Sequence, residues 1–112
     1  MNIQIFALKK NFDVQKAERY FKERRIPCQF IDLGKRGMSP RELESVCRSV
    51  GLEALVHTTD SDWESHYVLQ LQDRREALRI LSEKPELLNT PIVRNGPQAT
   101  VGYHPEIWEK WS

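Results

Sequence analysis

The spacing of apolar residues in the first third of the chain predicts a strand, a helix and a second strand. Residues 3–8 are mostly apolar and rich in strand formers, which predicts a strand buried on both faces. Val14, Ala17 and Phe21 follow at helical spacing with charged residues between them, and a second run of strand formers occupies 28–33. A strand, helix and strand of these lengths favour a right-handed crossover and parallel pairing.

The middle of the chain is predicted to be helical. Ser39 precedes a proline and is followed three residues later by Glu42, which is the pattern of a capping box at a helix start. Two more helices are predicted near 62–71 and 74–83, each opening on a capping residue, which is Ser61 for the first of them.

The last quarter of the chain predicts a hairpin and a final helix. Residues 91–93 and 98–103 read as two strands around Asn95 and Gly96, a dipeptide that favours tight hairpins, and a short helix follows His104. The full order is β-α-β, inserted helices, then β-β-α. This order predicts an α/β fold of the thioredoxin-like type, with a small mixed four-stranded sheet in a single domain that takes up the whole chain.

Composition narrows the classes of function. The 112 residues carry 17 Lys and Arg against 16 Asp and Glu, a net charge of +1, so neither nucleic acid nor an anionic membrane is expected as the main partner. No apolar run approaches a membrane span and no signal peptide is visible, which favours the cytoplasm. Cys28 and Cys47 form no Cys-x-x-Cys pair and are expected to be buried thiols.

The tryptophan and histidine side chains are expected to have structural roles and not catalytic or metal-binding ones. Trp63, Trp108 and Trp111 are expected in the core, although Trp108 and Trp111 could instead form an exposed strip for a partner. The three histidines are spaced in no metal-binding pattern, so no metal site is expected.

Several short motifs occur in the order found in one family. Residues 6–17 align with the family segment Tyr-Gly-Ile-Lys-x-Cys-x-x-x-x-Lys-Ala, with Asn11 at the cysteine. Residues 26–32 align with the family's second strand, and 38–43 match Leu-Ser-x-x-Glu-Leu. Near the end, 85–93 match Pro-x-Leu-Ile-x-Arg-Pro-Ile-Val and 101–103 match Val-Gly-Phe. In these segments the chain resembles the ArsC/Spx family, which contains arsenate reductases, Spx transcription regulators and YffB-like proteins.

The resemblance implies a thioredoxin-like fold in which Pro91 is the cis-proline facing the active-site loop. Active members of the family use a cysteine at the start of the first helix, where the helix dipole lowers its pKa, and arginines that hold an oxyanion. At these positions the chain has Asn11 for the cysteine, Thr90 for one arginine and Glu64 for another. Asn cannot form a thiolate and a carboxylate repels arsenate, so the family chemistry is expected to be lost.

Asn11 has two compatible interpretations. It is a good helix N-cap, a role that Asp13 could also fill, and the free amides after it could bind a small anion or a partner's carboxylate. The candidate ligand- or partner-binding residues are Lys9, Asn11, Phe12, Asp13, Thr90 and Pro91.

Three functional hypotheses follow. The first is a binding or regulatory module that contacts an unknown protein and has no redox activity. The second is a glutathione-dependent thiol oxidoreductase or arsenate reductase-like enzyme that uses Cys28, Cys47 or glutathione itself as the thiol. The third is a sensor of a small anion. No cofactor is expected. The resemblance allows glutathione as a possible exception.

Overall fold

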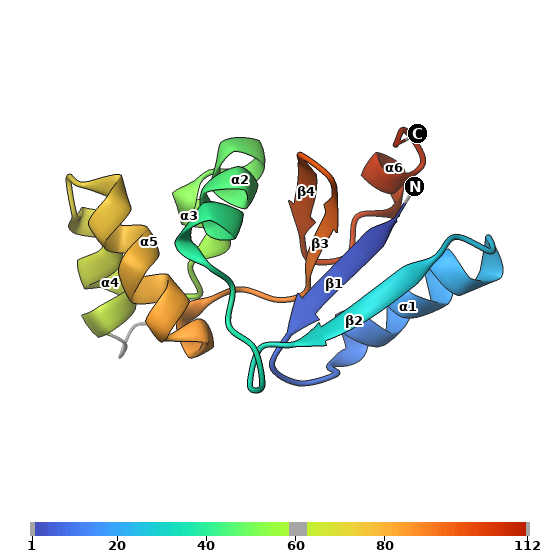
Figure 1. The fold of residues 1–112 in the computed structure, drawn as a ribbon, viewed down its shortest axis with the longest axis horizontal. Coiled ribbons are helices and arrows are strands. Elements are labelled where there is room, and N and C mark those ends of the chain that lie inside the picture. The colour runs from blue at the N-terminus through green and yellow to red at the C-terminus, as the bar shows by residue number, and fades with distance from the viewer. Residues whose placement is uncertain (1, 59–62, 112) are drawn as a thin grey trace.

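Four strands form one mixed sheet in the order β2-β1-β3-β4 (Figure 1). The strands are β1 (Ile3–Ala7), β2 (Cys28–Asp32), β3 (Ile92–Asn95) and β4 (Gln98–Val101). β1 pairs in parallel with β2 and antiparallel with β3, and β4 pairs antiparallel with β3. This computed structural model describes residues 2–58 and 63–111. The α/β class, the parallel first pair and the C-terminal hairpin predicted from the sequence are confirmed.

Helices cover both faces of the sheet. They are α1 (Phe12–Glu23), α2 (Pro40–Val50), α3 (Leu52–Leu55), α4 (Trp63–Gln70), α5 (Arg74–Glu83) and α6 (Pro105–Trp108), with a 3-10 turn at Pro85–Leu87. One core cluster packs the sheet against α1 and α6, and the other packs it against α2 and α5. β1 contributes Ile3, Ile5 and Ala7 to the first cluster and Phe6 to the second, so the prediction of a strand buried on both faces is confirmed.

Capping interactions fix two of the helix starts. The Ser39 hydroxyl accepts from the Glu42 amide at 3.1 Å, and Glu42 Oε1 accepts from the Ser39 amide at 3.0 Å, which is the predicted capping box of α2. The Asp73 carboxylate accepts from the Arg75 amide at 3.0 Å at the start of α5. The predicted cap of α4 at Ser61 lies outside the described residues.

The hairpin turn lies one residue later than its sequence suggested. Asn95 pairs with Gln98 in register, so Gly96 and Pro97 occupy the two central positions. Gly96 has φ +59°, as the first central residue of a type II′ turn requires, and the proline ring fixes the second. The strand after the turn ends at Val101, because Gly102 has φ +93° and donates its amide to the Pro91 carbonyl at 2.8 Å.

Two predictions of burial are wrong. Trp63 is 72% exposed on α4, whereas Trp108 and Trp111 are buried as expected, so they form no exposed strip. Cys28 is exposed because β2 is an edge strand with a single neighbour, whereas Cys47 is buried on α2 as predicted.

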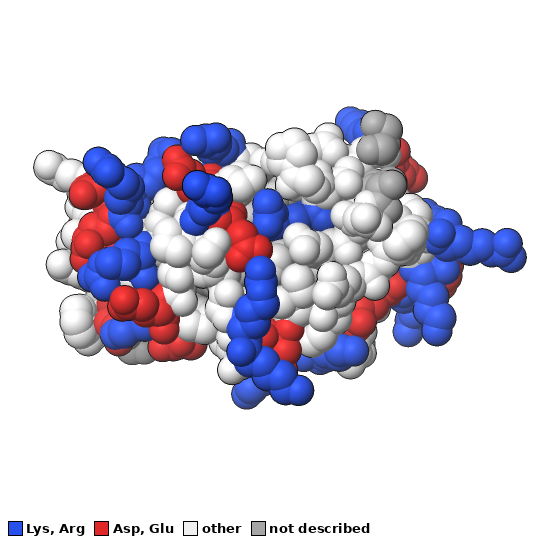
Figure 2. Space-filling view, in the orientation of Figure 1, with Lys and Arg blue, Asp and Glu red and all other residues white. Residues whose placement is uncertain are grey.

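Charged side chains of both signs lie next to each other on the surface. Figure 2 shows acidic and basic groups interspersed over the end of the molecule that carries α4 and α5. There Arg79 pairs with Glu76 and Glu83, and Lys84 pairs with Glu64. Within the described ranges, no helix has both the length and the hydropathy needed to cross a membrane.

Candidate functional site

The topology brings the loop after β1 and the segment before β3 to one end of the sheet. Phe6 pairs with Ile92 in register, so the chain leaving β1 at Ala7 runs beside the chain entering β3 at Pro91. The Thr90–Pro91 peptide bond is cis, as the resemblance implied. The predicted set Lys9, Asn11, Phe12, Asp13, Thr90 and Pro91 therefore lies at a common end of the fold.

Asn11 is the N-cap of α1. Its side-chain oxygen accepts from the Val14 amide at 2.8 Å, and its own amide donates to the Lys9 carbonyl at 2.9 Å. Of the two capping candidates, Asn11 and not Asp13 takes this role. The side-chain oxygen therefore satisfies one of the free amides in the first turn of α1.

The segment before Pro91 is held by an asparagine that sequence reasoning missed. Asn89 Nδ2 donates to the Ala54 carbonyl at 2.9 Å and the Val56 carbonyl at 3.1 Å, and its Oδ1 lies 2.9 Å from His57 Nδ1. These contacts hold the segment that precedes Pro91 against α3 and against Val56, which forms an isolated β-bridge with Leu88. Its partners lie more than 30 positions earlier in the chain, so no local pattern marked Asn89.

Glu64 does not join the Asn11 end of the sheet. It pairs with Lys84 and borders a hollow between α4 and α5 whose other lining residues also come from those two helices and Lys84. The structure therefore places Asn11 and Thr90 at the same end of the sheet and Glu64 in the helical insertion.

Neither thiol is placed for chemistry at Asn11. Cys28 begins β2 and pairs in register with Ile3, at the end of the sheet opposite Asn11. Partial desolvation, with a smaller effect of the Glu18 carboxylate, raises the pKa of Cys28 to about 11. Cys47 is buried in the core beneath α2. Among the described residues no three His, Cys, Asp or Glu side chains gather as a metal site.

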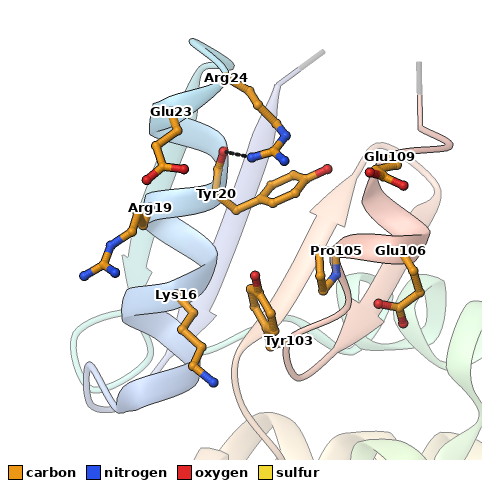
Figure 3. Close-up of a pocket in the computed structure, with 9 residues that line it drawn as sticks. All are labelled: Lys16, Arg19, Tyr20, Glu23, Arg24, Tyr103, Pro105, Glu106 and Glu109. Carbon is orange, nitrogen blue, oxygen red and sulfur yellow. Dashed lines mark hydrogen bonds between the residues drawn. The ribbon is translucent and has the colours of Figure 1, made fainter.

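A second concave feature lies between α1 and α6. It is an open groove of about 640 Å³ (Figure 3), lined by Lys16, Arg19, Tyr20, Glu23, Arg24, Tyr103, Pro105, Glu106 and Glu109. The sequence did not mark this groove, because its two walls come from opposite ends of the chain. It adjoins the Asn11 end through Lys16, whose ammonium lies 5.9 Å from the Phe12 ring and 5.3 Å from the Tyr103 ring.

Comparison with known proteins identifies the family of this chain. The sequence profile of the ArsC family matches residues 6–111. An uncharacterized protein of Haemophilus influenzae is 23% identical over 109 residues, which cover 96% of each chain.

Solved structures agree on the fold. An arsenate reductase from Vibrio cholerae superimposes with a TM-score of 0.78 at 21% identity, over 96% of this chain and 94% of that one. A Staphylococcus aureus protein solved by NMR gives a TM-score of 0.79 at 19% identity, over 96% of both chains. At these identities the likeness establishes the arsenate reductase-like, thioredoxin-type fold and leaves activity to the residues of the site.

Proposed function

The chain belongs to the ArsC family, and on that premise we propose that it is a member without redox catalysis that acts as a protein-binding or regulatory module. The proposal includes a cytoplasmic location, since two free cysteines without a partner are typical of reducing compartments.

The observation that carries the proposal is the role of Asn11. In active relatives the thiolate at this position is stabilised by the free amides of the first turn. Here the side-chain oxygen accepts from the Val14 amide instead, and an amide group can form neither a mixed disulfide nor an arsenic–sulfur bond. Thr90 at the position of the family arginine supports the same conclusion, because a hydroxyl holds an oxyanion far more weakly than a guanidinium.

The thiols support the loss of catalysis. A reactive cysteine needs a lowered pKa and a position beside its substrate site. Cys28 has a raised pKa and lies at the far end of the sheet, and Cys47 is buried. These properties disfavour an enzyme that uses Cys28 or Cys47 as its working thiol.

A protein surface at the Asn11 end is the proposed contact. Phe12 is 78% exposed at the first position of α1, and Lys9 and Lys10 are exposed in the loop before it. An exposed aromatic ring is a feature that protein partners recognise, and the two lysines favour a partner surface of negative charge.

A glutathione-coupled arsenate reduction assay tests the proposal. The wild type is expected to show no turnover above background, and Asn11→Cys is expected to gain little, because the arginine positions are also changed. Cys28→Ser and Cys47→Ala serve as controls and should leave the background unchanged. Wild-type turnover that disappears in either control would contradict the proposal and identify the working thiol.

A further inference from the structure

The two walls of the groove between α1 and α6 carry net charges of opposite sign. Lys16, Arg19 and the C-cap residue Arg24 line it from the α1 side together with a single acid, Glu23. Glu106 and Glu109 line it from the α6 side (Figure 3). Glu106 pairs with His104 on its own side at 3.1 Å, and within residues 2–58 and 63–111 no ion pair crosses the groove. The two walls therefore hold charges that the protein itself does not neutralise across the gap.

Arg24 is held in place at one end of the groove. Its guanidinium carbon lies 3.7 Å from the centroid of the Tyr20 ring, and Nη1 donates to the Tyr20 carbonyl at 3.2 Å. Stacking and a backbone hydrogen bond fix the plane of the guanidinium, and its other N–H groups have no partner among the described residues. A positioned guanidinium with free donors is suited to a carboxylate.

Tyr20 places a hydroxyl at the floor. The residue is only 6% exposed, and its ring packs against Phe21 and Trp108 with centroids 5.1 and 5.2 Å away. Figure 3 shows the hydroxyl pointing from α1 across the groove toward the α6 side, and no described residue makes a hydrogen bond with it. The hydroxyl is therefore open to the groove, where it can donate to or accept from a polar group of a ligand.

Lys16 and Arg24, the first and last of the three cations on the α1 side, set the length of a ligand. Lys16 is held near the Phe12 and Tyr103 rings at the other end of the groove, eight positions from Arg24. Eight positions correspond to about 12 Å along a helix, which an extended chain covers in about four or five residues.

We propose that the groove between α1 and α6 binds an extended segment of a partner protein in which acidic and basic side chains alternate. Successive side chains of an extended chain point to opposite sides, so acids would face Lys16 and Arg24 while bases face Glu106 and Glu109. The groove is open along its length, which suits a peptide better than an enclosed small molecule. This inference goes beyond the proposed function, since it requires nothing of Asn11.

An NMR titration of the full chain tests the inference. The probe is acetyl-Glu-Lys-Glu-Lys-Glu-amide, and the matched control is acetyl-Glu-Glu-Glu-Lys-Lys-amide, which has the same composition with segregated charges. The alternating peptide is expected to give saturable shifts at Tyr20, Arg24 and Glu109, and the segregated one to bind more weakly. Raising the salt concentration should weaken the binding, because the contacts are exposed ion pairs.

Substitutions in the α1 wall, the α6 wall and the floor of the groove test whether the peptide binds there. Arg24→Gln, Glu109→Gln and Tyr20→Phe are each expected to weaken binding about two- to fivefold. Their controls are Arg41→Gln on α2 and Tyr67→Phe on α4, both exposed and outside the groove, which should bind as the wild type does.

Three results of the titration would overturn the inference. They are the absence of saturable shifts, equal affinity for the two peptides, and shifts of the same size with free lysine and glutamate. A dimer in sedimentation that blocks the groove would also overturn it, because a second copy would then be the occupant. Binding by Asn11→Cys should match the wild type, so failure here is separate from failure of the arsenate assay.

Discussion

The indole Nε1–H of Trp108 donates to Thr100 Oγ1 at 2.8 Å, in a contact where both residues are buried. The bond joins α6 to β4 and fixes the tryptophan whose ring packs against Tyr20. The C-terminal helix is only four residues long, so this bond and the surrounding aromatic packing hold it on the sheet rather than its own helical hydrogen bonds.

Thr100→Val is expected to lower the free energy of unfolding by about 1–3 kcal/mol. Valine keeps the shape of threonine and leaves the buried indole N–H without an acceptor, which costs the desolvation of that donor. Urea unfolding measures the effect, and Thr58→Val, at an exposed position, should change stability by less than about 0.5 kcal/mol. Equal stability of the two variants would show that the indole bond contributes nothing.

The capping box of α2 predicts a pH dependence of stability. Burial acts to raise the pKa of Glu42, but hydrogen bonds from the Ser39 amide and Arg36 together hold that pKa below its usual range. A folded-state pKa below the unfolded one stabilises the fold above the unfolded pKa, and this contribution is lost as the pH falls through the folded-state value.

Glu42→Gln is therefore expected to destabilise the protein by about 1 kcal/mol at neutral pH. It should also reduce the loss of stability on acidification, because the group that takes up a proton is gone. Thermal unfolding between neutral and acidic pH measures both effects. Glu53→Gln is the control and should lose stability on acidification as the wild type does. If Glu42→Gln also loses as much stability as the wild type, Glu42 is not the group responsible.

Asn11 gives a prediction about stability that is independent of its family position. Asn11→Ala should cost about 0.5–2 kcal/mol, because the Val14 amide loses its acceptor, whereas Asn11→Asp should keep the cap and lose little. Chemical unfolding of the three proteins compares them directly. A loss as large in the Asp variant as in the Ala variant would mean that the side-chain oxygen is not what stabilises the helix start.

Local patterns predicted those parts of the fold that local physics determines. The capping box at Ser39 and the apolar spacing of the first helix are properties of a few neighbouring residues, and both are confirmed. The burial of Cys28 and Trp63 was predicted wrongly, because exposure depends on which strand lies at the sheet edge and which helix face meets a neighbour. Neither property can be read from spacing.

Sequence reasoning likewise found one part of the candidate site and missed another. The resemblance implied a cis peptide bond before Pro91, which the structure has, and the pairing of β1 with β3 puts Asn11, Thr90 and Pro91 at one end of the sheet. Their role as a binding site stays a prediction. The groove of Tyr20, Arg24 and Glu109 was missed because a helix near the start and a turn of helix near the end form it only after folding.

The Cys28 thiol gives the sharpest test of the hypothesis that another cysteine has replaced the family nucleophile. Partial desolvation and the Glu18 carboxylate raise its pKa to about 11, so little thiolate exists at neutral pH. In a Cys47→Ala background, alkylation by iodoacetamide near pH 8 should be about a hundredfold slower than for a free cysteine. Glu18→Gln should lower the midpoint of the thiolate titration, because it removes the second cause of the shift. A midpoint below that of free cysteine would instead give Cys28 the reactivity of a catalytic thiol and revive the oxidoreductase hypothesis.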